Sequence, residues 1–549
     1  MLVSEYCAMS PKQVFVREAT GLVRDISTLD VFQYNVASFN GPITALTIVI
    51  ISPLVGGWPI GWMLFGTVTI FFTILTYNML AAAMPRTGGD YIYVSRILHP
   101  SLGLAIAGIG GFLEPAFFLG GIFATGWIAS GVSPFLLVAG LVYNNPGLTS
   151  LGTILTVPTN TAIIGVIGVL IFTLICGCMT TRKVMKIVDV LMLIGTIVAV
   201  LCIVILFLPS NSQFIGSFNS VAKTFGTSYS GVITSAASSG WFAPGYNTYN
   251  SMLGSVLVWE SFCWILYSTT LGGEVKSARR SLLFGNMSTL AVWFFIISGI
   301  VLATTKTVGQ DFLSASEYLQ LFNPASWKFP LPTSIALFAG LVSSNPLVSG
   351  LMAIGFGCAL LAGMPWSFLQ ISRYSFALSF DRVFPASLSD VNERFHTPLK
   401  SIILSSVLGI LVVLFFIFPI TAPLILFLTV GIVPGCAITW AITSLAAVLF
   451  PYRAKTIFDL SPYKRRIAGI PLVSIVGAIS TFFCVLYVYL FLRYPTDFGL
   501  GTSTIQAATF MGVEVGTIVV FFLLFFIIRA YRKSQGLNLD LAFKEIPPE

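Results

Sequence analysis

Three carboxyl side chains lie inside long apolar stretches of this chain, at Glu114, Glu260 and Glu514. A charged group is costly in hydrocarbon, and burial favours the protonated form of a carboxyl. Each of these residues could therefore take up and release a proton within a membrane. The alternative for each is a neutral, hydrogen-bonded carboxyl with a packing role, and this explanation fits Glu514 best.

The first apolar stretch, Ser27 to Pro53, is interrupted at its middle by Asn40-Gly41-Pro42. Proline removes an amide donor and glycine loosens the backbone, so a membrane helix tolerates this run only beside protein or a water-filled cavity. Interrupted helices of this kind form substrate and ion sites in membrane transporters. A simple proline kink is the alternative, but the Asn and Gly before the proline favour a true break.

The composition determines which elements must position these residues. With 56% hydrophobic residues, 9% charged residues and a mean hydropathy of +0.93 over 549 residues, the chain is a polytopic membrane protein. Stretches long enough to cross the hydrocarbon recur about twelve times. We predict spans at 27–54, 58–83, 102–130, 161–179, 187–208, 252–271, 287–304, 347–372, 401–419, 422–450, 469–492 and 505–528.

The distribution of basic residues predicts the orientation of these spans. If the N-terminus is internal, all but four of the 28 Lys and Arg residues fall on the inner side. This is the positive-inside pattern, and it places both termini in the cytoplasm and the chain in the cell membrane among lipids. The net charge of +8 then orients the protein and does not indicate a nucleic acid partner.

The eight cysteines lie almost entirely within apolar spans, so we expect no disulfide framework. Cys176 and Cys178 are too close along one helix to face each other, and no His accompanies them, so we predict no metal site. The N-terminus lacks the features of a signal peptide, and the first span is expected to remain in the mature protein.

The spans and loops suggest a division of the chain, although no sequence repeat is obvious. Five spans, a long loop, five spans and two more would place the second five upside down relative to the first. Residues 335–342, in an outer loop, could form a short helix on the surface. The predicted parts are an N-terminal cytoplasmic tail (1–26), a first repeat (27–208), an outer loop (209–251), a second repeat (252–450), two further helices (469–528) and a cytoplasmic C-terminal tail (529–549).

Three internal stretches resemble the amino acid, polyamine and organocation (APC) superfamily of transporters. Residues 85–93 contain Arg86 and Gly88-Gly89 and are similar to the family's pattern after helix 2. Residues 272–280 contain Glu274 and Lys276 and resemble the segment that closes helix 6, with Ala278 where the family usually has Pro. Residues 373–398, with Arg373 and Asp381, are similar to the pattern after helix 8. Glu274 could pair with basic residues of neighbouring internal loops and latch an inner gate, or these motifs could simply orient the loops at the lipid headgroups.

The resemblance implies an all-α integral membrane protein with about twelve transmembrane helices. Ten of them would form a five-plus-five inverted repeat, the LeuT-like or APC fold, with helices 1 and 6 discontinuous. It also implies an amino acid permease whose ligand lies between the two breaks. Free amides at one helix end suit a carboxylate and free carbonyls at another suit an ammonium. The implied site residues are Phe39, Asn40, Gly41, Pro42, Ile43, Ser261, Phe262, Cys263, Trp264, Ile265 and Leu266.

The helix 6 segment departs from the family at Trp264. The family commonly has Gly, an apolar residue and Glu there, whereas this chain has bulky residues. A bulky ring would shrink the site, and without the family's Glu a cationic side chain becomes a less suitable cargo, so we expect a neutral amino acid. The alternative is that Trp264 faces lipid or packs between helices.

The coupling ion is left open by the sequence. Some proton-coupled relatives place a Lys in helix 5, and counting along the chain puts that position near Gly195 or Thr196, with no Lys or Arg inside any predicted span. Sodium would need helix 1 carbonyls and helix 8 hydroxyls, which are few. H⁺ is the first candidate, with Glu260 ahead of Glu114 because it lies nearer the expected site, and Na⁺ remains an alternative. Asp30 and Asp189 are expected to begin helices.

The sequence leaves alternatives to transport of an amino acid. A polyamine or another organic cation would need acidic residues in the site, for which Glu114 and Glu260 are the candidates. A non-transporting sensor or partner subunit with this fold is a further alternative. An intramembrane enzyme would need clustered polar groups, yet the only two His residues, His99 and His396, lie in internal loops. No cofactor is expected, and the oligomeric state is left open.

Overall fold

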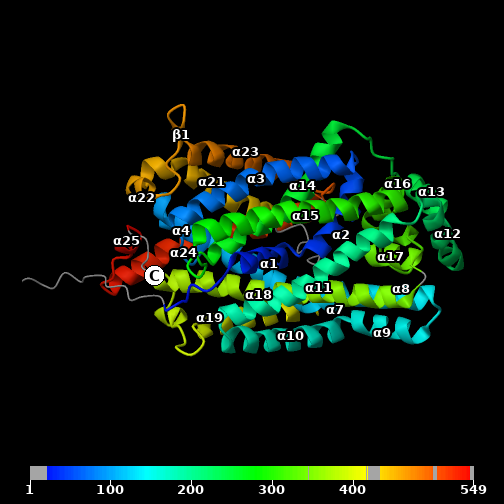
Figure 1. The fold of residues 1–549 in the computed structure, drawn as a ribbon, viewed down its shortest axis with the longest axis horizontal. Coiled ribbons are helices and arrows are strands. Elements are labelled where there is room, and N and C mark those ends of the chain that lie inside the picture. The colour runs from blue at the N-terminus through cyan, green and yellow to red at the C-terminus, as the bar shows by residue number, and fades with distance from the viewer. Residues whose placement is uncertain (1–20, 344, 416, 418–432, 499–503, 545–549) are drawn as a thin grey trace, which may run out of the picture.

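The computed structural model describes residues 21–343, 345–415, 417, 433–498 and 504–544 of the chain. Most of them lie in helices that run along the long axis of the molecule (Figure 1). Nine helical segments among these residues are long and apolar enough to cross a membrane. They are α3 (Pro59–Ala83), the composite segment Pro100–Val142, α10 (Pro158–Cys178), α11 (Thr181–Phe207), α15 (Ala278–Val308), α18 (Pro346–Phe380), α21 (Val433–Arg453), α23 (Leu472–Arg493) and α24 (Thr504–Ser534).

The composite segment changes its helix type several times. Six residues before Glu114 and eight residues from Phe118 onward are π-helical, a form that is rare and often marks functional sites. Pro115 lies between them and cannot donate a backbone hydrogen bond. The parts of the composite segment are α5 (Pro100–Ala107), η1 (Gly108–Leu113), α6 (Glu114–Phe117), η2 (Phe118–Thr125), α7 (Gly126–Ala129) and α8 (Ser133–Val142).

The remaining predicted spans fall on shorter helices. The windows 401–419 and 422–450 both reach into residues 418–432, which lie outside the described part of the chain. The total of twelve spans and the inverted repeat therefore stay predictions. The shorter helices are α1 (Thr28–Phe39), α2 (Gly41–Val55), α14 (Thr248–Cys263), η4 (Trp264–Thr270) and α19 (Leu399–Phe415).

The predicted outer loops contain helices. The helix at residues 335–342 is present as α17, but its side chains are buried, so its expected place on the surface is wrong. It packs against α8, α11 and α12. The helices within the predicted outer loops are α9 (Pro146–Thr156), α12 (Asn211–Ala222), η3 (Lys223–Phe225), α13 (Tyr229–Ser238), α16 (Gln310–Phe322), η5 (Pro324–Ser326) and α17 (Ile335–Val342).

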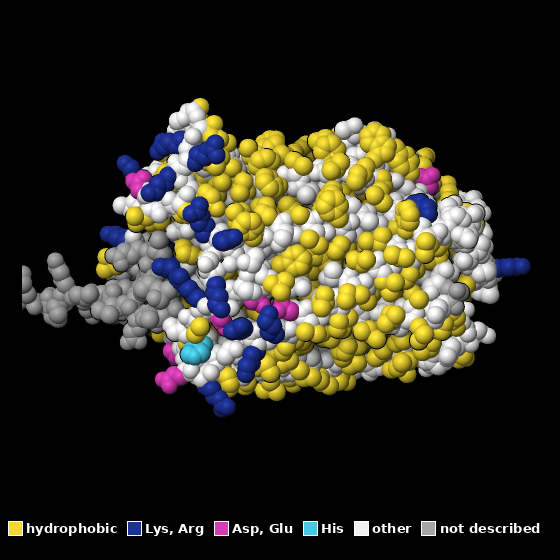
Figure 2. Space-filling model, viewed as in Figure 1, with side chains coloured by type: hydrophobic (Ala, Val, Ile, Leu, Met, Phe, Trp, Pro, Cys, Tyr) yellow, Lys and Arg dark blue, Asp and Glu magenta, His cyan; other side chains and the backbone are white. Residues whose placement is uncertain are grey.

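The opposite end of the molecule, where α22 and α25 lie in Figure 1, is named here the basic end. On the face shown in Figure 2, Lys and Arg side chains gather at this end and hydrophobic side chains cover the middle. A belt of apolar surface with charge at one end fits a protein that spans a membrane. The short elements here are α4 (Gly89–Ile97), η6 (Ala386–Ser389), α22 (Lys455–Leu460), the paired strands β1 (Arg466–Ile467) and β2 (Ile470–Pro471), and α25 (Leu539–Ala542).

Helix α1 lies at the centre of the bundle. It contacts α11, α15, α18 and η4, and nine of its twelve residues are buried. Its N-terminus is capped by Ser27, whose hydroxyl accepts from the Asp30 amide while the Asp30 carboxylate accepts from the Ser27 amide. Asp30 therefore begins a helix, as predicted.

Gly88 offers a test of how tightly the turn before α4 is packed. Its φ is +105°, and a Cβ there would lie 2.5 Å from the Cβ of Ala377. We expect Gly88→Ala to lower the free energy of unfolding by about 1–3 kcal/mol, because it combines backbone strain with a clash. Unfolding of the purified protein in detergent measures this.

Gly216→Ala in α12 is the control, because an added Cβ would meet no atom within 4 Å. It should be neutral or slightly stabilising, since Ala favours a helix over Gly. Equal stability of the two variants would contradict this description of the turn.

Candidate functional site

The backbone of the first span is interrupted at Asn40. Helix α1 ends at Phe39, and Asn40 adopts left-handed angles (φ 48°, ψ 66°) before α2 begins at Gly41. Asn tolerates this conformation better than most residues, and Pro42 has no amide with which to continue the first helix. Asn40 Nδ2 donates to the carbonyl oxygen of Ala359 in α18 at 2.7 Å. The interruption is thus tied to a neighbouring helix.

Gly41 is required where α2 starts. A Cβ at this position would lie 2.1 Å from the ring of Trp293 in α15, so no larger residue fits without displacing that ring. The ring of Trp293 also contacts Phe39 edge-on, with centroids 5.5 Å apart. Trp293 therefore packs against both sides of the interruption.

The backbone of helix 6 changes next to this interruption. α14 ends at Cys263 and continues as the 3-10 helix η4 from Trp264. The Ser38 hydroxyl donates to the carbonyl oxygen of Trp264 at 2.9 Å, and the Phe39 and Phe262 rings lie 5.7 Å apart. The two segments that the sequence singled out are therefore in contact.

A cavity of about 170 Å³ opens between these segments. This is close to the roughly 150 Å³ of a cavity that binds benzene, so it suits a small molecule. Four of the expected site residues line it, namely Phe39, Asn40, Ser261 and Trp264. The other lining residues are Thr44, Thr47, Phe118, Gly121, Ile122, Phe123, Gly126, Ser130, Glu260 and Leu360.

The remaining expected residues lie beside the cavity. Gly41 faces Trp293, and Pro42 and Ile43 have side chains outside the described part of the chain. The rest are buried but do not line it: Phe262, Cys263, Ile265 and Leu266.

One wall of the cavity comes from the composite segment Pro100–Val142, called helix 3 below, and was not among the residues predicted from the sequence. It runs from Phe118 to Ser130 and includes Gly121 and Gly126. Much of it is the π-helical segment η2. Closely spaced glycines after an intramembrane Glu-Pro were the available signal, because they let a helix approach a ligand closely.

Trp264 lines the cavity and packs against other aromatic side chains. Its ring lies 5.0 Å from Phe118, 5.7 Å from Trp440 and 6.1 Å from Tyr267. It is only 4% exposed, so the alternative that it faces lipid is wrong. One ring therefore joins η2, η4 and α21.

The two leading carboxyls have different surroundings. Glu260 lines the cavity, and its Oε2 has no hydrogen-bond partner among the described residues. Glu114 is fully buried outside the lining, where its Oε2 accepts from Tyr267 Oη at 2.5 Å and from Cys436 Sγ at 3.2 Å. In the sequence each is a Glu within an apolar stretch, so this difference in hydrogen-bond partners and in contact with the cavity is a property of the fold.

Glu514 is also buried, on α24. It packs against α21, where a Cβ at Gly435 would lie 2.9 Å from its carboxyl carbon. It is not among the residues that line the cavity.

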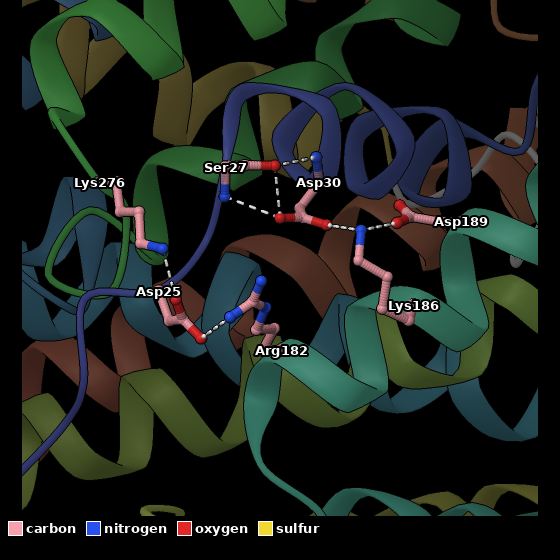
Figure 3. A network of polar contacts seen from close by, with 7 residues as sticks. All are labelled: Asp25, Ser27, Asp30, Arg182, Lys186, Asp189 and Lys276. Carbon is pink, nitrogen blue, oxygen red and sulfur yellow. Dashed lines mark hydrogen bonds and ion pairs between the residues drawn. The ribbon is translucent and has the colours of Figure 1, made fainter.

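Ion pairs join α1 to α11 at the basic end (Figure 3). Lys186 bridges Asp30 at 3.0 Å and Asp189 at 2.6 Å. α11 begins at Thr181, so Asp189 lies in its third turn and the prediction that it begins a helix is wrong. The predicted span begins too late, at residue 187, because the basic residues at 182–186 are typical of an internal loop.

Asp25 makes a second connection in the same region (Figure 3). It pairs with Lys276 at 2.5 Å and with Arg182 at 3.2 Å. The hydrogen bond from Lys276 and the charge of Arg182 hold the pKa of Asp25 below its ordinary value. This carboxylate therefore stays charged, and the contact intact, until the pH falls below the usual Asp range.

Glu274 makes one of two almost fully buried ion pairs described in this region, the other being Arg96–Asp381. Its carboxylate accepts from Arg373 Nε and Nη2, both at 2.7 Å, and from the Thr181 hydroxyl at 2.9 Å. The expected partner was a loop residue, but Arg373 lies within α18, which extends to Phe380. Arg373 lies one residue beyond the predicted span 347–372, on the same continuous helix.

The first and third motif stretches also meet at the basic end. The Gly88 amide donates to the Thr270 carbonyl at 3.0 Å, and Asp381 accepts from Arg96 Nη2 at 2.7 Å and from Tyr91 Oη at 2.8 Å. Arg86 is half-buried, with its Nη1 donating to the Pro85 carbonyl. The three stretches that carry the family resemblance thus form one connected region.

Comparison with known protein families gives a match over most of the chain. The model of a family described as amino acid permease matches residues 29–523, which includes the interrupted first span, the cavity and all three motif stretches. No curated protein matches the chain.

Breaking the Glu274–Arg373 pair tests its contribution to stability. Arg373→Ala should lower the free energy of unfolding by about 3–5 kcal/mol, because it leaves a buried carboxylate without its partner. Replacing both residues with Leu should cost less than that single change. Denaturant unfolding in detergent measures both.

Lys400→Ala is the matched control, because Lys400 and Asp390 form a solvent-exposed pair. Its cost should lie within about 1 kcal/mol. If Arg373→Ala were as mild as this control, the buried pair would not hold the basic end together.

Proposed function

Since the chain belongs to the amino acid permease family, we propose that it is a secondary active transporter that carries a neutral amino acid across the cell membrane. The observation that carries the proposal is the small cavity where the interruption at Asn40 meets the change of helix type at Trp264. Both elements, and the helix 3 wall, come from the matched residues. A transporter, and not an enzyme, is what this family membership supports.

The arrangement suits a zwitterion of modest size. α2 begins at Gly41, beside the cavity, without a side-chain cap, and the dipole at a helix N-terminus favours a carboxylate nearby. Apart from Asn40 and Glu260, the described lining residues are aromatic, aliphatic, hydroxyl-bearing or Gly, and none of them is Lys, Arg or His. An uncharged side chain is therefore the cargo that fits best.

Alternating access would proceed around this site. In our proposal the basic end faces the cytoplasm, as the positive-inside pattern predicts, and the Glu274–Arg373 pair acts as an inner latch. The pair joins the segment after helix 6 to α18, and Asp25 joins the start of helix 1 to the same segment. Opening inward requires these contacts to separate.

We propose H⁺ as the coupling ion, with Na⁺ as the alternative, and we place Glu114 ahead of Glu260 as its carrier because Glu114 is enclosed with its own donors whereas Glu260 lines the cavity. Glu114 is buried within hydrogen-bond distance of Tyr267, and Tyr267 stacks on Trp264 of the cavity wall. A change in protonation at Glu114 would thereby reach the substrate site through one ring contact.

A second candidate cargo is a small organic cation. The specific observation in its favour is Glu260, an acidic group among the aromatic lining residues. A thermal-shift screen of the twenty amino acids and common polyamines separates the two cargos. Stabilisation by amines alone would overturn the amino acid.

Uptake into proteoliposomes tests transport and its coupling. Labelled L-alanine or L-leucine should enter saturably and faster when the outside is acidic. Glu114→Gln should abolish this acceleration while binding is retained, because a carboxamide cannot carry the proton. Binding without any saturable flux would instead support a non-transporting sensor. A flux that follows sodium and ignores pH would overturn proton coupling.

Trp264→Ala tests the limit on cargo size. Removing the ring enlarges the cavity, so the preference for L-leucine over L-alanine should rise by roughly tenfold, the scale on which apolar pockets discriminate. The measurement is the ratio of the two kcat/KM values. Trp440→Ala is the control, since Trp440 packs on Trp264 without lining the cavity. An unchanged ratio in Trp264→Ala would contradict this role.

A further inference from the structure

The connection between α21 and α23 lies at the edge of the membrane. It contains the hairpin of β1 and β2, and β2 ends at Pro471, directly before α23 begins at Leu472. α23 has 22 residues, which rise about 33 Å and so barely exceed the hydrocarbon thickness of about 30 Å. The hairpin therefore has no linker that could carry it away from the depth of the lipid headgroups.

The hairpin projects sideways from the bundle (Figure 1). Its turn, Ala468-Gly469, has φ values of 48° and 82°, as in the tight two-residue turns that join antiparallel strands. The register pairs Ile467 with Ile470, so their side chains lie next to each other on one face. Because the helices cross the membrane along the long axis of the molecule, a sideways projection extends along the membrane surface.

The isoleucine pair lacks a cover of protein in the described part of the chain. Ile467 and Ile470 are 49% and 50% exposed, and Leu460 in the same connection is 87% exposed. Adjacent exposed apolar side chains are unfavourable in water, and a two-stranded hairpin is only marginally stable there. The acyl chains beside the start of α23 are the nearest apolar material that could bury this pair.

Three basic residues directly precede the isoleucine pair. Lys464, Arg465 and Arg466 are all exposed, and none of the ion pairs between described residues involves them. The connection contains one acidic residue, Asp459. Arg466 Nη1 donates to the Gly469 carbonyl at 3.1 Å, which keeps its charge beside the turn. Cations next to exposed apolar side chains match a lipid with an anionic headgroup.

We infer that this hairpin is an interfacial anchor for anionic lipid in the leaflet at the basic end. Ile467 and Ile470 enter the boundary between headgroups and acyl chains, and the basic residues at 464–466 bind the lipid phosphates. A soluble acidic protein offers the same charge, but the direct passage into α23 and the sideways projection place the hairpin against lipid. The inference is independent of what the protein transports.

Hydrogen exchange of the full-length protein in nanodiscs tests the anchor. The two lipid compositions are phosphatidylcholine alone and phosphatidylcholine mixed with anionic phosphatidylglycerol. Exchange of the amides at 464–470 should be slower by roughly tenfold in the anionic mixture, because each basic residue held near an anionic surface adds to the attraction. High salt should remove most of this difference, since it screens exposed charges.

Two variants separate the charged and apolar contributions. Replacing all three basic residues at 464–466 with Gln should abolish the difference between the two lipid compositions. Ile467→Ser combined with Ile470→Ser should speed exchange in both compositions, because the apolar contact is lost while the charges remain.

The matched control removes the same charge elsewhere at the basic end. Lys183→Gln, Arg394→Gln and Lys400→Gln change three exposed basic residues outside the connection and should leave the exchange of the hairpin as in wild type. The wild-type comparison between lipids needs no variant, so it decides the matter even if a variant fails to fold.

Three results would overturn the inference. Fast and equal exchange in both compositions would show that the hairpin is open to water and free for a soluble partner. Equal protection by soluble glycerol phosphate would indicate a phosphate site and not a lipid surface. Equally slow exchange with and without phosphatidylglycerol would remove the role of the basic residues. None of these results bears on transport, which uptake measures separately.

Discussion

The structure around the cavity depends on one constraint, the need to satisfy an interrupted backbone inside a membrane. Inside a membrane, backbone amides and carbonyls left free at Asn40 must form hydrogen bonds with protein or with water in a cavity. Here the Asn40 side chain binds α18, Ser38 binds the carbonyl of Trp264, and Trp293 packs against Gly41. The interruption therefore requires helix 6, α15 and α18 to lie where they do.

The sequence predicted this part of the site because its signals are local. Asn40, Gly41 and Pro42 adjoin in the chain, and each has a known effect on a helix. The helix 3 wall could not be predicted in the same way, because the π-helical form of η2 depends on what packs against it. Likewise, Arg373 and Glu274 are 99 residues apart, so their pairing is a property of the fold.

The misplaced boundaries have a common cause. Window methods end a membrane helix where charge begins, yet α11 and α18 both continue past that point. They can do so because their charged residues find partners. Lys186 lies between two carboxylates, and Arg373 is enclosed by Glu274 and Thr181. Hydropathy thus predicts where the apolar part of a helix ends. The helix itself continues as far as its charged residues find partners in the fold.

The contacts at the basic end differ in what it costs to separate them. Asp25 pairs with half-exposed Lys276 and Arg182, and solvent can replace those contacts at little cost. Arg373 and Glu274 are both almost fully buried, so separating them requires water or other polar groups to reach both charges at the same time. The exposed pairs can open one at a time, but the buried pair opens only as a unit with the end of α18. Arg96–Asp381 is as deeply buried and also lies at the end of α18, so in the proposed transport cycle both buried pairs would have to separate for the protein to open inward.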